Sequence, residues 1–222
     1  MKKNAIFTIL FVIASIALCF VCELKLLPIS REEVFAFITG ALCVWLTVLE
    51  NIWNWPIGIL NSAIFLDLFY RDRLFADSFL QVLYIILGFL GWYWWLKGGT
   101  NRSELTVSRT PIWGWIILPL AGVLGGWLMY RHLVEVKDSA PLLDSVTTIL
   151  SLVAQFQLTK KYIENWWIWM TADVIYIYLY STRGLYLTAV LYALFIVMCG
   201  IGLRDWRRSL NRTQVTLDPV HA

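Results

Sequence analysis

The sequence predicts an all-α integral membrane protein with eight transmembrane helices. Hydrophobic residues make up 59% of the 222 positions and charged residues 15%, whereas about 25% of the residues in a soluble domain are charged. The mean hydropathy is +0.68, and apolar runs extend along nearly the whole chain. Too little polar surface remains to solvate a water-soluble fold of this size, so the chain belongs in a lipid bilayer.

Eight stretches of roughly 20 mainly apolar residues are long enough to cross a bilayer. They cover about residues 5–22, 34–50, 55–70, 75–97, 112–130, 141–158, 162–182 and 184–204. The first run follows Lys2 and Lys3, as a secretory signal would, but no small-residue cleavage site comes after it, so we expect a retained helix. The polar stretch 97–110 is expected to be a cytosolic connector.

The charge pattern indicates an orientation in the membrane and excludes a nucleic-acid partner. The net charge of +3 is small, arises from the ends and loops of the chain, and forms no basic groove. With the N-terminus in the cytoplasm, 11 basic residues lie inside and 7 outside, which is the expected sign of bias. Both termini are therefore predicted to be cytoplasmic.

Two parts of the chain resemble each other. Residues 50–55 (ENIWNW) match residues 164–169 (ENWWIW) at an offset of 114, and residues 74–95 match residues 185–206 at an offset of 111, so a three-residue deletion reconciles the blocks. One helix lies between the two three-helix units, which gives both units the same orientation, as in transporters with parallel repeats and a substrate site between them. The alternative is a coincidence between tryptophan-rich apolar segments.

The predicted organisation is a single transmembrane domain. Its parts are an extra N-terminal helix and outer loop (1–33), a first three-helix repeat (34–97), a cytosolic connector, linker helix and outer loop (98–140), a second three-helix repeat (141–204) and a cytosolic tail (205–222).

Ionisable side chains within or at the margins of the predicted spans are acidic, and such residues are functional candidates because burying charge in a membrane is costly. They are Asp67, Asp77, Asp144, Glu164 and Asp173. Lysine and arginine are expected only at the ends of the spans and in loops. An interior of this kind favours a neutral or cationic substrate and lacks the basic clamp that a phosphate usually needs.

The sharpest constellation lies on the span 162–182. Trp166, Trp169, Asp173, Tyr176 and Tyr180 share one helical stripe by their spacing. Asp173 lies twelve residues beyond Lys161, or roughly 18 Å along the helix axis, which is near mid-membrane. Indole faces beside a carboxylate suit a flat cationic heteroaromatic ring. The alternative is an aromatic packing seam around a protonated Asp173.

Three further polar faces are expected to point away from lipid. They comprise Asp144, Thr148, Ser151 and Gln155 on one span, Asp77, Gln81 and Tyr84 on another, and Asn51, Asn54 and Asn61 around the start of the span 55–70. Hydrogen bonding between helices explains any one face as well as ligand contact does. The predicted substrate-binding residues are Trp166, Trp169, Asp173, Tyr176, Gln81, Tyr84, Asn51, Asn61, Asp144, Thr148 and Gln155.

The sequence argues against a membrane enzyme. His132 and His221 fall in a predicted outer loop and in the tail, and no hydrolase, metalloprotease or nucleotide-binding motif occurs. The four cysteines lie in apolar runs and are interpreted as small hydrophobic residues. We therefore expect no catalytic residue, metal site or cofactor, and the open alternatives are a carrier and a membrane protein that binds without transporting.

Residues 164–173 (ENWWIWMTAD) and 184–188 (GLYLT) resemble the PnuC family of bacterial vitamin transporters. In that family a W-x-x-W-x-x-x-N/D pattern lies in the corresponding helix, and here it consists of Trp166, Trp169 and Asp173. The family pattern often ends in Asn where this chain has Asp173. Similarities to the family's first repeat occur at Glu50-Asn51, at residues 55–58 (WPIG), at Leu80-Gln81 and at Gly91-Trp92, so the likeness covers about residues 34–208.

The resemblance implies a SWEET-like order of three helices, one linker helix and three helices, and a homotrimer in the bacterial cytoplasmic (inner) membrane. It also implies uptake of nicotinamide riboside by facilitated diffusion, with intracellular phosphorylation trapping the vitamin. The pyridinium cation of this unphosphorylated substrate matches the stripe of indoles around Asp173. Relatives called PnuT carry thiamine, which also contains a flat cationic ring, and others are linked to riboflavin, so these substrates stay open.

Overall fold

The structure, a computed structural model, describes residues 31–71, 75–137, 140–182 and 186–217. Its helices are α2 (Arg31–Val48), α3 (Asn54–Arg71), α4 (Phe75–Lys97), α5 (Ile112–Glu135), α6 (Pro141–Thr159), α7 (Asn165–Thr182) and α8 (Tyr186–Leu217), with a short 3-10 helix, η1 (Thr100–Arg102). The β-type pairing within the described ranges is one isolated bridge, between Ser108 and Tyr162. The predicted all-α class is confirmed for these residues, and the predicted helix 5–22 lies outside them.

The chain divides into two compact units, Met1–Leu42 and Cys43–Ala222. Of the first unit the structure describes the opening turns of α2, where the Thr39 hydroxyl donates a hydrogen bond of 2.7 Å to the Phe35 carbonyl. The second unit contains the last turns of α2, the other helices and every residue of the predicted substrate site.

Segments long and apolar enough to cross a membrane occur in α4, α5, α6 and α8. They are Ser78–Lys97, Ile112–Glu135, Pro141–Thr159 and Ala189–Thr213. These four segments, found among the described residues, are fewer than the eight predicted spans. The helices α3 and α7 are each 18 residues long, but their Asn, Asp, Trp and Tyr residues lower the mean hydropathy. Polar and aromatic side chains of this kind are tolerated where a helix faces protein or the membrane interface.

The helix bounds agree with prediction most closely at α4, and two helices run further than expected. The helix α5 ends at Glu135 instead of residue 130, and α8 ends at Leu217 instead of residue 204. In this extension of α8, Trp206 and Leu210 are buried, whereas Arg207 and Arg208 are exposed. The extension is therefore amphipathic, and most of the predicted tail 205–222 is helical. Its arginines lower the mean hydropathy, so an apolar-run criterion did not predict that the helix continues.

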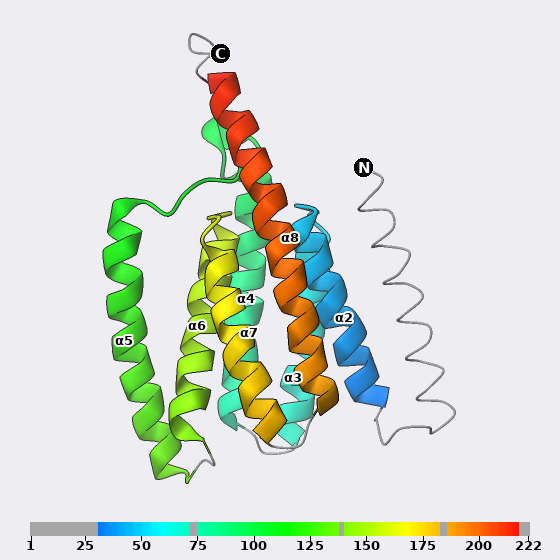
Figure 1. Ribbon diagram of the computed structural model, residues 1–222, viewed down its shortest axis with the longest axis vertical. Helices are drawn as coiled ribbons and strands as arrows, with labels where there is room; N and C mark the ends of the chain where they lie inside the picture. The colour runs from blue at the N-terminus through cyan, green and yellow to red at the C-terminus, as the bar shows by residue number, and fades with distance from the viewer. Residues whose placement is uncertain (1–30, 72–74, 138–139, 183–185, 218–222) are drawn as a thin grey trace. The chain divides into compact units, whose positions relative to one another are not determined.

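Within the unit Cys43–Ala222, neighbouring helices form two pairs, α3 with α4 and α7 with α8. The helix α6 packs against both α4 and α7, and α5 packs along α6 at the edge of the unit, as Figure 1 shows. The residues linking α4 to α5 form the connector, 98–111. We call the end of this unit where α4 and α6 end, and α3 and α7 begin, the connector end.

The connector is tied to the loop between α6 and α7. The Ser108 amide donates to the Lys161 carbonyl at 3.1 Å, and the Ile163 amide donates to the Ser108 carbonyl at 3.0 Å. The Glu164 carboxylate accepts hydrogen bonds from both the amide and the hydroxyl of Thr110, at 2.8 and 2.9 Å. Glu164 thus holds the connector, and this explains its position at a predicted span margin without a role in ligand binding.

The two halves of the unit correspond at a single offset of 111. The helices α3 and α7 begin at Asn54 and Asn165, and α4 and α8 begin at Phe75 and Tyr186. The turn after α2 and the turn after α6 repeat the same backbone hydrogen bonds at this offset, and each contains a residue with positive φ, Glu50 at 52° and Lys161 at 50°. The offset of 114 proposed for residues 50–55 is therefore wrong, and no deletion is needed.

An indole packs on a glycine at the same offset. A Cβ atom added to Gly91 would lie 2.2 Å from the Trp55 ring, and one added to Gly202 would lie 2.5 Å from the Trp166 ring. Trp55 meets Trp95 edge to face at 5.4 Å between ring centroids, and Trp166 meets Trp206 in the same way at 5.2 Å. The tight approach of α3 to α4, and of α7 to α8, thus depends on these glycines.

Candidate substrate site

Asp173 lies inside the helical unit and does not face lipid. Its residue is 3% exposed, and its Oδ2 atom lies 3.8 Å from the Cys199 thiol of α8. The thiol is a weak donor and cannot neutralise a carboxylate. A charged carboxylate buried in such surroundings is costly unless a partner compensates it. A cationic ligand would supply that compensation.

Three tyrosines form a stack one to two turns further along α7. Tyr176 and Tyr180 of α7 are stacked at 6.0 Å, and Tyr192 of α8 lies on both of them, at 4.6 and 5.4 Å between centroids. Tyr192 also has an electrostatic interaction with Asp173. The stack therefore places several aromatic faces and phenol groups beside the buried carboxylate.

Hydroxyl side chains of α4 and α6 also belong to this group of residues. Side-chain contacts join Ser151 of α6 to the hydroxyls of Tyr84 and Tyr176. Thr147 also contacts Tyr176, and Asp144 interacts with it electrostatically. Four helices, α4, α6, α7 and α8, thus contribute to one polar and aromatic cluster.

The structure brings together part of the predicted set. This cluster contains the predicted residues Asp173, Tyr176, Tyr84 and Asp144. It also contains Tyr192, Cys199 and Thr147, which were not among the predicted ligand contacts. A signal for Tyr192 did exist, because it lies 111 residues after Gln81. The match of residues 74–95 to residues 185–206 already made the two positions equivalent, but Gln81 was not carried over to its counterpart.

The two predicted stacking tryptophans have different surroundings. Trp166 is almost fully buried against Gly202 and Trp206, whereas Trp169 is half-buried. The position of Trp166 is explained by helix packing at the connector end. Its role as a stacking residue for the substrate stays a prediction.

The remaining predicted residues lie on several elements. Gln81 of α4, Asn61 of α3, and Thr148 and Gln155 of α6 are half-buried. Asn51 lies in the turn after α2, where its Oδ1 atom accepts a hydrogen bond of 3.0 Å from the Trp53 amide. That bond fixes the turn, so Asn51 has a structural reason for its position. Their contact with substrate stays a prediction.

The other predicted carboxylates lie away from the cluster or are not described. Asp67 is exposed near the end of α3 and forms an ion pair of 2.7 Å with Arg71. The side chain of Asp77 lies outside the described residues. Within the described part of the chain, no three His, Cys, Asp or Glu residues come together in a way that could hold a metal ion.

A model of the nicotinamide mononucleotide transporter family matches residues 30–208 of the chain. The chain belongs to this family. It is a family of transporters and not of enzymes, and the resemblance found in the sequence is thereby confirmed.

Curated relatives of this family member include PnuC proteins. The chain is 27% identical over 207 residues to the nicotinamide riboside transporter PnuC of Escherichia coli (strain K12), which covers 82% of this chain and 87% of the relative. It is 25% identical over 192 residues to the PnuC of Haemophilus influenzae, with coverage of 84% and 83%. It is 22% identical over 173 residues to the riboflavin/roseoflavin transporter RibM of Streptomyces davaonensis, with coverage of 76% and 81%.

A solved structure has the same fold. The crystal structure of the vitamin B3 transporter PnuC superimposes with a TM-score of 0.74, at 24% identity, and covers 96% of this chain and 93% of that chain. The all-helical membrane architecture of this transporter-family member is therefore shared with PnuC.

A cavity in this transporter-family member lies away from the cluster. It has a volume of about 600 Å³, lies between α5 and α6, and includes Trp115, Gly122, Trp127, Ile149 and Gln157 in its lining. None of the predicted substrate contacts lines it. Its walls are apolar and α5 is largely exposed, so this cavity has the character of a lipid-facing groove.

The charged groups of the α6–α7 loop lie outside the spans. Burial lowers the pKa of Lys160, whose ammonium lies 3.2 Å from the centroid of the Trp94 ring. Burial, and after it the Glu164 carboxylate, raise the pKa of the Tyr162 phenol. Both effects follow from the packing of this loop against the connector and the end of α4.

Proposed function

We propose that this chain is a transporter that carries nicotinamide riboside across the bacterial cytoplasmic membrane. In this proposal the vitamin enters by facilitated diffusion, and phosphorylation inside the cell traps it. The observation that carries the proposal is the buried carboxylate of Asp173 beside the stack of Tyr176, Tyr180 and Tyr192. The names of the PnuC relatives support the same substrate.

The chemistry of the cluster fits a pyridinium ring. The ring is flat and carries a delocalised positive charge, so it gains from aromatic faces through cation–π attraction and from a carboxylate through direct charge pairing. The neutral ribose offers hydroxyls that can hydrogen-bond to amides and hydroxyls such as Gln81, Thr148 and Gln155. Trp169, Asn61, Tyr84 and Asp144 complete the proposed lining, and Trp166 and Asn51 are expected at its edge nearest the connector end.

Charge favours the riboside over the mononucleotide in the family's name. Among the described residues the buried cation is Lys161, and its ammonium lies 3.1 Å from a carboxylate oxygen of Glu50. A phosphate usually requires unpaired basic groups, and an interior that carries Asp173 repels a dianion. An unphosphorylated cation is therefore the better match.

The full architecture is part of the proposal. We infer eight transmembrane helices in the order of one extra helix, three helices, a linker helix and three helices, with α5 as the linker and both termini in the cytoplasm. The offset of 111 between the α3–α4 and α7–α8 pairs supports this order. A homotrimer is expected from the family resemblance.

Thiamine is the second candidate substrate. It also contains a flat cationic ring, and a carboxylate at position 173, where the family pattern often has Asn, could pair with either cation. The relationship to RibM keeps riboflavin as a third candidate, although riboflavin is neutral and would leave Asp173 without a counter-charge.

A calorimetric titration of the purified protein with nicotinamide riboside, nicotinamide mononucleotide, thiamine and riboflavin tests the proposal. We expect the riboside to bind most tightly and the mononucleotide weakly. Uptake of the preferred vitamin into proteoliposomes would then distinguish a carrier from a protein that only binds. Dominant binding of thiamine or riboflavin would replace the proposed substrate, and binding without uptake would contradict transport.

A further inference from the structure

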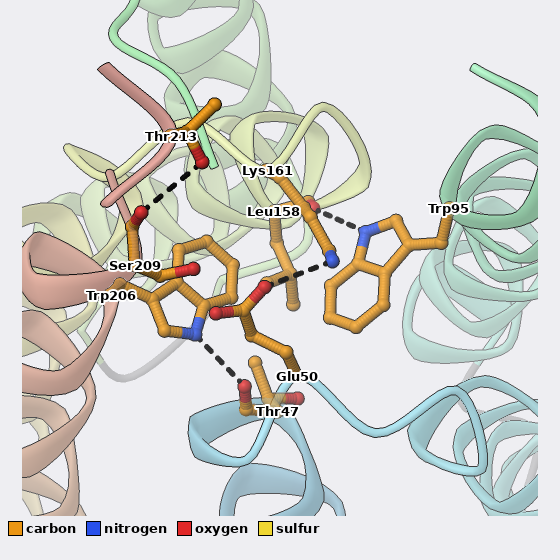
Figure 2. A network of polar contacts seen from close by, with 8 residues as sticks. All are labelled: Thr47, Glu50, Trp95, Leu158, Lys161, Trp206, Ser209 and Thr213. Atoms are coloured by element: carbon orange, nitrogen blue, oxygen red, sulfur yellow. Dashed lines mark hydrogen bonds and ion pairs between the residues drawn. The ribbon is translucent and has the colours of Figure 1, made fainter. Parts of the chain in front are cut away.

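The turns that follow α2 and α6 meet at the connector end through a buried ion pair. The Lys161 ammonium lies 3.1 Å from the Glu50 Oε2 atom, and the two side chains are 9% and 26% exposed. Figure 2 shows this pair between the rings of Trp95 and Trp206. The Lys161 ammonium also lies 4.4 Å from the centroid of the Trp95 ring. Glu50 and Lys161 occupy equivalent positions of the two halves but carry opposite charges.

Two indole hydrogen bonds cross between the halves at the same level. Trp95 of α4 donates from Nε1 to the Leu158 carbonyl of α6, and Trp206 of α8 donates from Nε1 to the Thr47 carbonyl of α2, each at 3.1 Å (Figure 2). The two acceptors lie in the last turns of their helices, and each carbonyl also accepts a backbone hydrogen bond of 3.0 Å, Thr47 from the Glu50 amide and Leu158 from the Lys161 amide. The last helix of each half is thus bonded to the first helix of the other half.

These contacts make a closed layer between the connector end and the candidate substrate site. Trp206 of this layer packs on Trp166, and Trp166 precedes Asp173 by seven residues of α7, or roughly 10 Å along the helix. A ligand beside Asp173 would have to pass this layer to leave through the connector end.

The layer also contains buried polar atoms without a hydrogen-bond partner, and exposure of these atoms to water would remove the cost of leaving them unpaired. Among the described residues, the buried side-chain atoms without a hydrogen-bond partner are Trp55 Nε1, Asn54 Oδ1, Trp166 Nε1, Asn165 Oδ1 and Gln157 Oε1. The first four form two equivalent pairs at the offset of 111. A buried unpaired polar atom costs free energy, so the stabilisation from the ion pair and the indole bonds is partly offset. A layer balanced in this way is suited to open and close.

We propose that Glu50, Lys161, Trp95 and Trp206 form a gate, and that the Glu50–Lys161 pair must separate each time substrate passes the connector end. This inference rests on the proposed transport function. It adds a role for four residues outside the substrate cluster. The opposite charges at equivalent positions draw the two halves together on closing, and removal of one partner leaves the other charge buried and uncompensated.

Cross-linking tests whether the pair must separate. In the double variant E50C/K161C, a short bis-methanethiosulfonate would join the two turns through a disulfide bond to each cysteine, with methanesulfinate as the leaving group. We expect the reagent to abolish proteoliposome uptake of the preferred vitamin, and a reductant that cleaves the linker to restore it. Equilibrium binding should survive, because the cross-link does not prevent the protein from opening toward the other side. The single variants E50C and K161C, treated identically, control for the native cysteines.

The outcomes of this experiment separate the gate from the proposed function. Undiminished uptake after complete cross-linking would overturn the gate. Loss of both binding and uptake on cross-linking would also overturn it, because the pair would then act on the site itself. Failure of the uncross-linked protein to bind any of the vitamins would instead contradict the proposed function.

Thiol accessibility gives an independent test that needs no cross-link. Thr47 is buried beside the gate, where its carbonyl accepts the Trp206 hydrogen bond, so in the detergent-solubilised variant T47C a water-soluble maleimide should react slowly. We expect labelling to be about tenfold faster or more when E50Q is added, and to slow again in a T47C protein that carries the charge swap E50K/K161E. Equal labelling rates with and without E50Q, after subtraction of protein without T47C, would overturn the gate.

Discussion

Asp173 carries a carboxylate whose burial costs free energy, and the proposed function relates that cost to the charge of the substrate. Its carboxylate lies beside a thiol and a stack of tyrosines, neighbours that offer weak hydrogen bonds and aromatic faces but no positive charge. In the proposed function, a ligand with a delocalised cation supplies the missing counter-charge. We therefore expect neutral or anionic relatives of that ligand to bind less tightly.

Removing the charge at position 173 should weaken binding without disturbing the fold. We expect Asp173→Asn to lower affinity for nicotinamide riboside by about tenfold or more, because a charge-assisted contact is lost, while thermal unfolding of the detergent-solubilised protein changes little. Calorimetry measures the first effect. Asp67→Asn is the matched control, since that carboxylate is exposed near the end of α3. Equal affinities of the two variants would remove Asp173 from the site.

Tyr192 provides a second test at this scale. Its ring stacks on Tyr176 and Tyr180, so Tyr192→Leu should lower ligand affinity by about two- to tenfold through lost aromatic contact. Tyr178→Leu is the control, because Tyr178 lies on α7 but is exposed. If Tyr192→Leu lowers thermal stability and leaves affinity unchanged, the stack is a packing feature and not a ligand wall.

At the scale of elements, the distance between the paired helices is set by a glycine on which an indole ring packs. The ring of Trp166 occupies the space that a side chain at position 202 would need, and Trp55 does the same at position 91. Because both tryptophans are buried, their rings have little room to move aside. The spacing of α7 and α8 therefore depends on the absence of one methyl group.

Substitution by alanine should have different effects on stability at Gly200 and Gly202, two glycines of α8. Gly202→Ala should destabilise the protein by about 1–3 kcal/mol through overpacking. Gly200→Ala should be neutral or stabilising by up to about 1 kcal/mol, because nothing lies within 4 Å of an added Cβ atom and alanine favours a helix. Thermal or denaturant unfolding in detergent compares them. Similar effects of the two substitutions would contradict the packing explanation.

At the scale of the whole molecule, the distribution of basic residues predicts the orientation. We expect a C-terminal green fluorescent protein fusion to fluoresce and a C-terminal alkaline phosphatase fusion to be inactive, because the excess of lysine and arginine places that end in the cytoplasm. An active phosphatase fusion would reverse the topology. The gate at the connector end would then face the periplasm, without change to its internal contacts.

Local patterns predicted the helices well, and tertiary contacts explain where they failed. The apolar run 75–97 has the bounds of α4, because hydropathy and helix length carry that information. The extension of α8 was missed because Trp206 and Leu210 are buried among arginines. The burial of Lys161 was missed for a different reason: its partner Glu50 is 111 residues away, and a pair of loop charges gives no sequence signal of contact.

Part of the polar and aromatic cluster around Asp173 was predictable from the sequence for similar reasons. The helical spacing identified Asp173 and Tyr176 on one face, since both lie on α7. Tyr192 and Cys199 belong to α8, and only the packing of α7 against α8 brings them to Asp173. The match of residues 74–95 to residues 185–206 at an offset of 111 already made Gln81 and Tyr192 equivalent. Carrying each candidate residue from one repeat to the other would therefore have added Tyr192 to the predicted site.

The opposite signs of Glu50 and Lys161 mean that the two halves can no longer replace one another. Two copies of the first half would oppose carboxylate to carboxylate, and two copies of the second would oppose ammonium to ammonium, whereas one of each attracts. A homodimer of either half with a neutral residue at this position would carry no such preference. We therefore expect that assembling this fold from two copies of one half would require a neutral residue there.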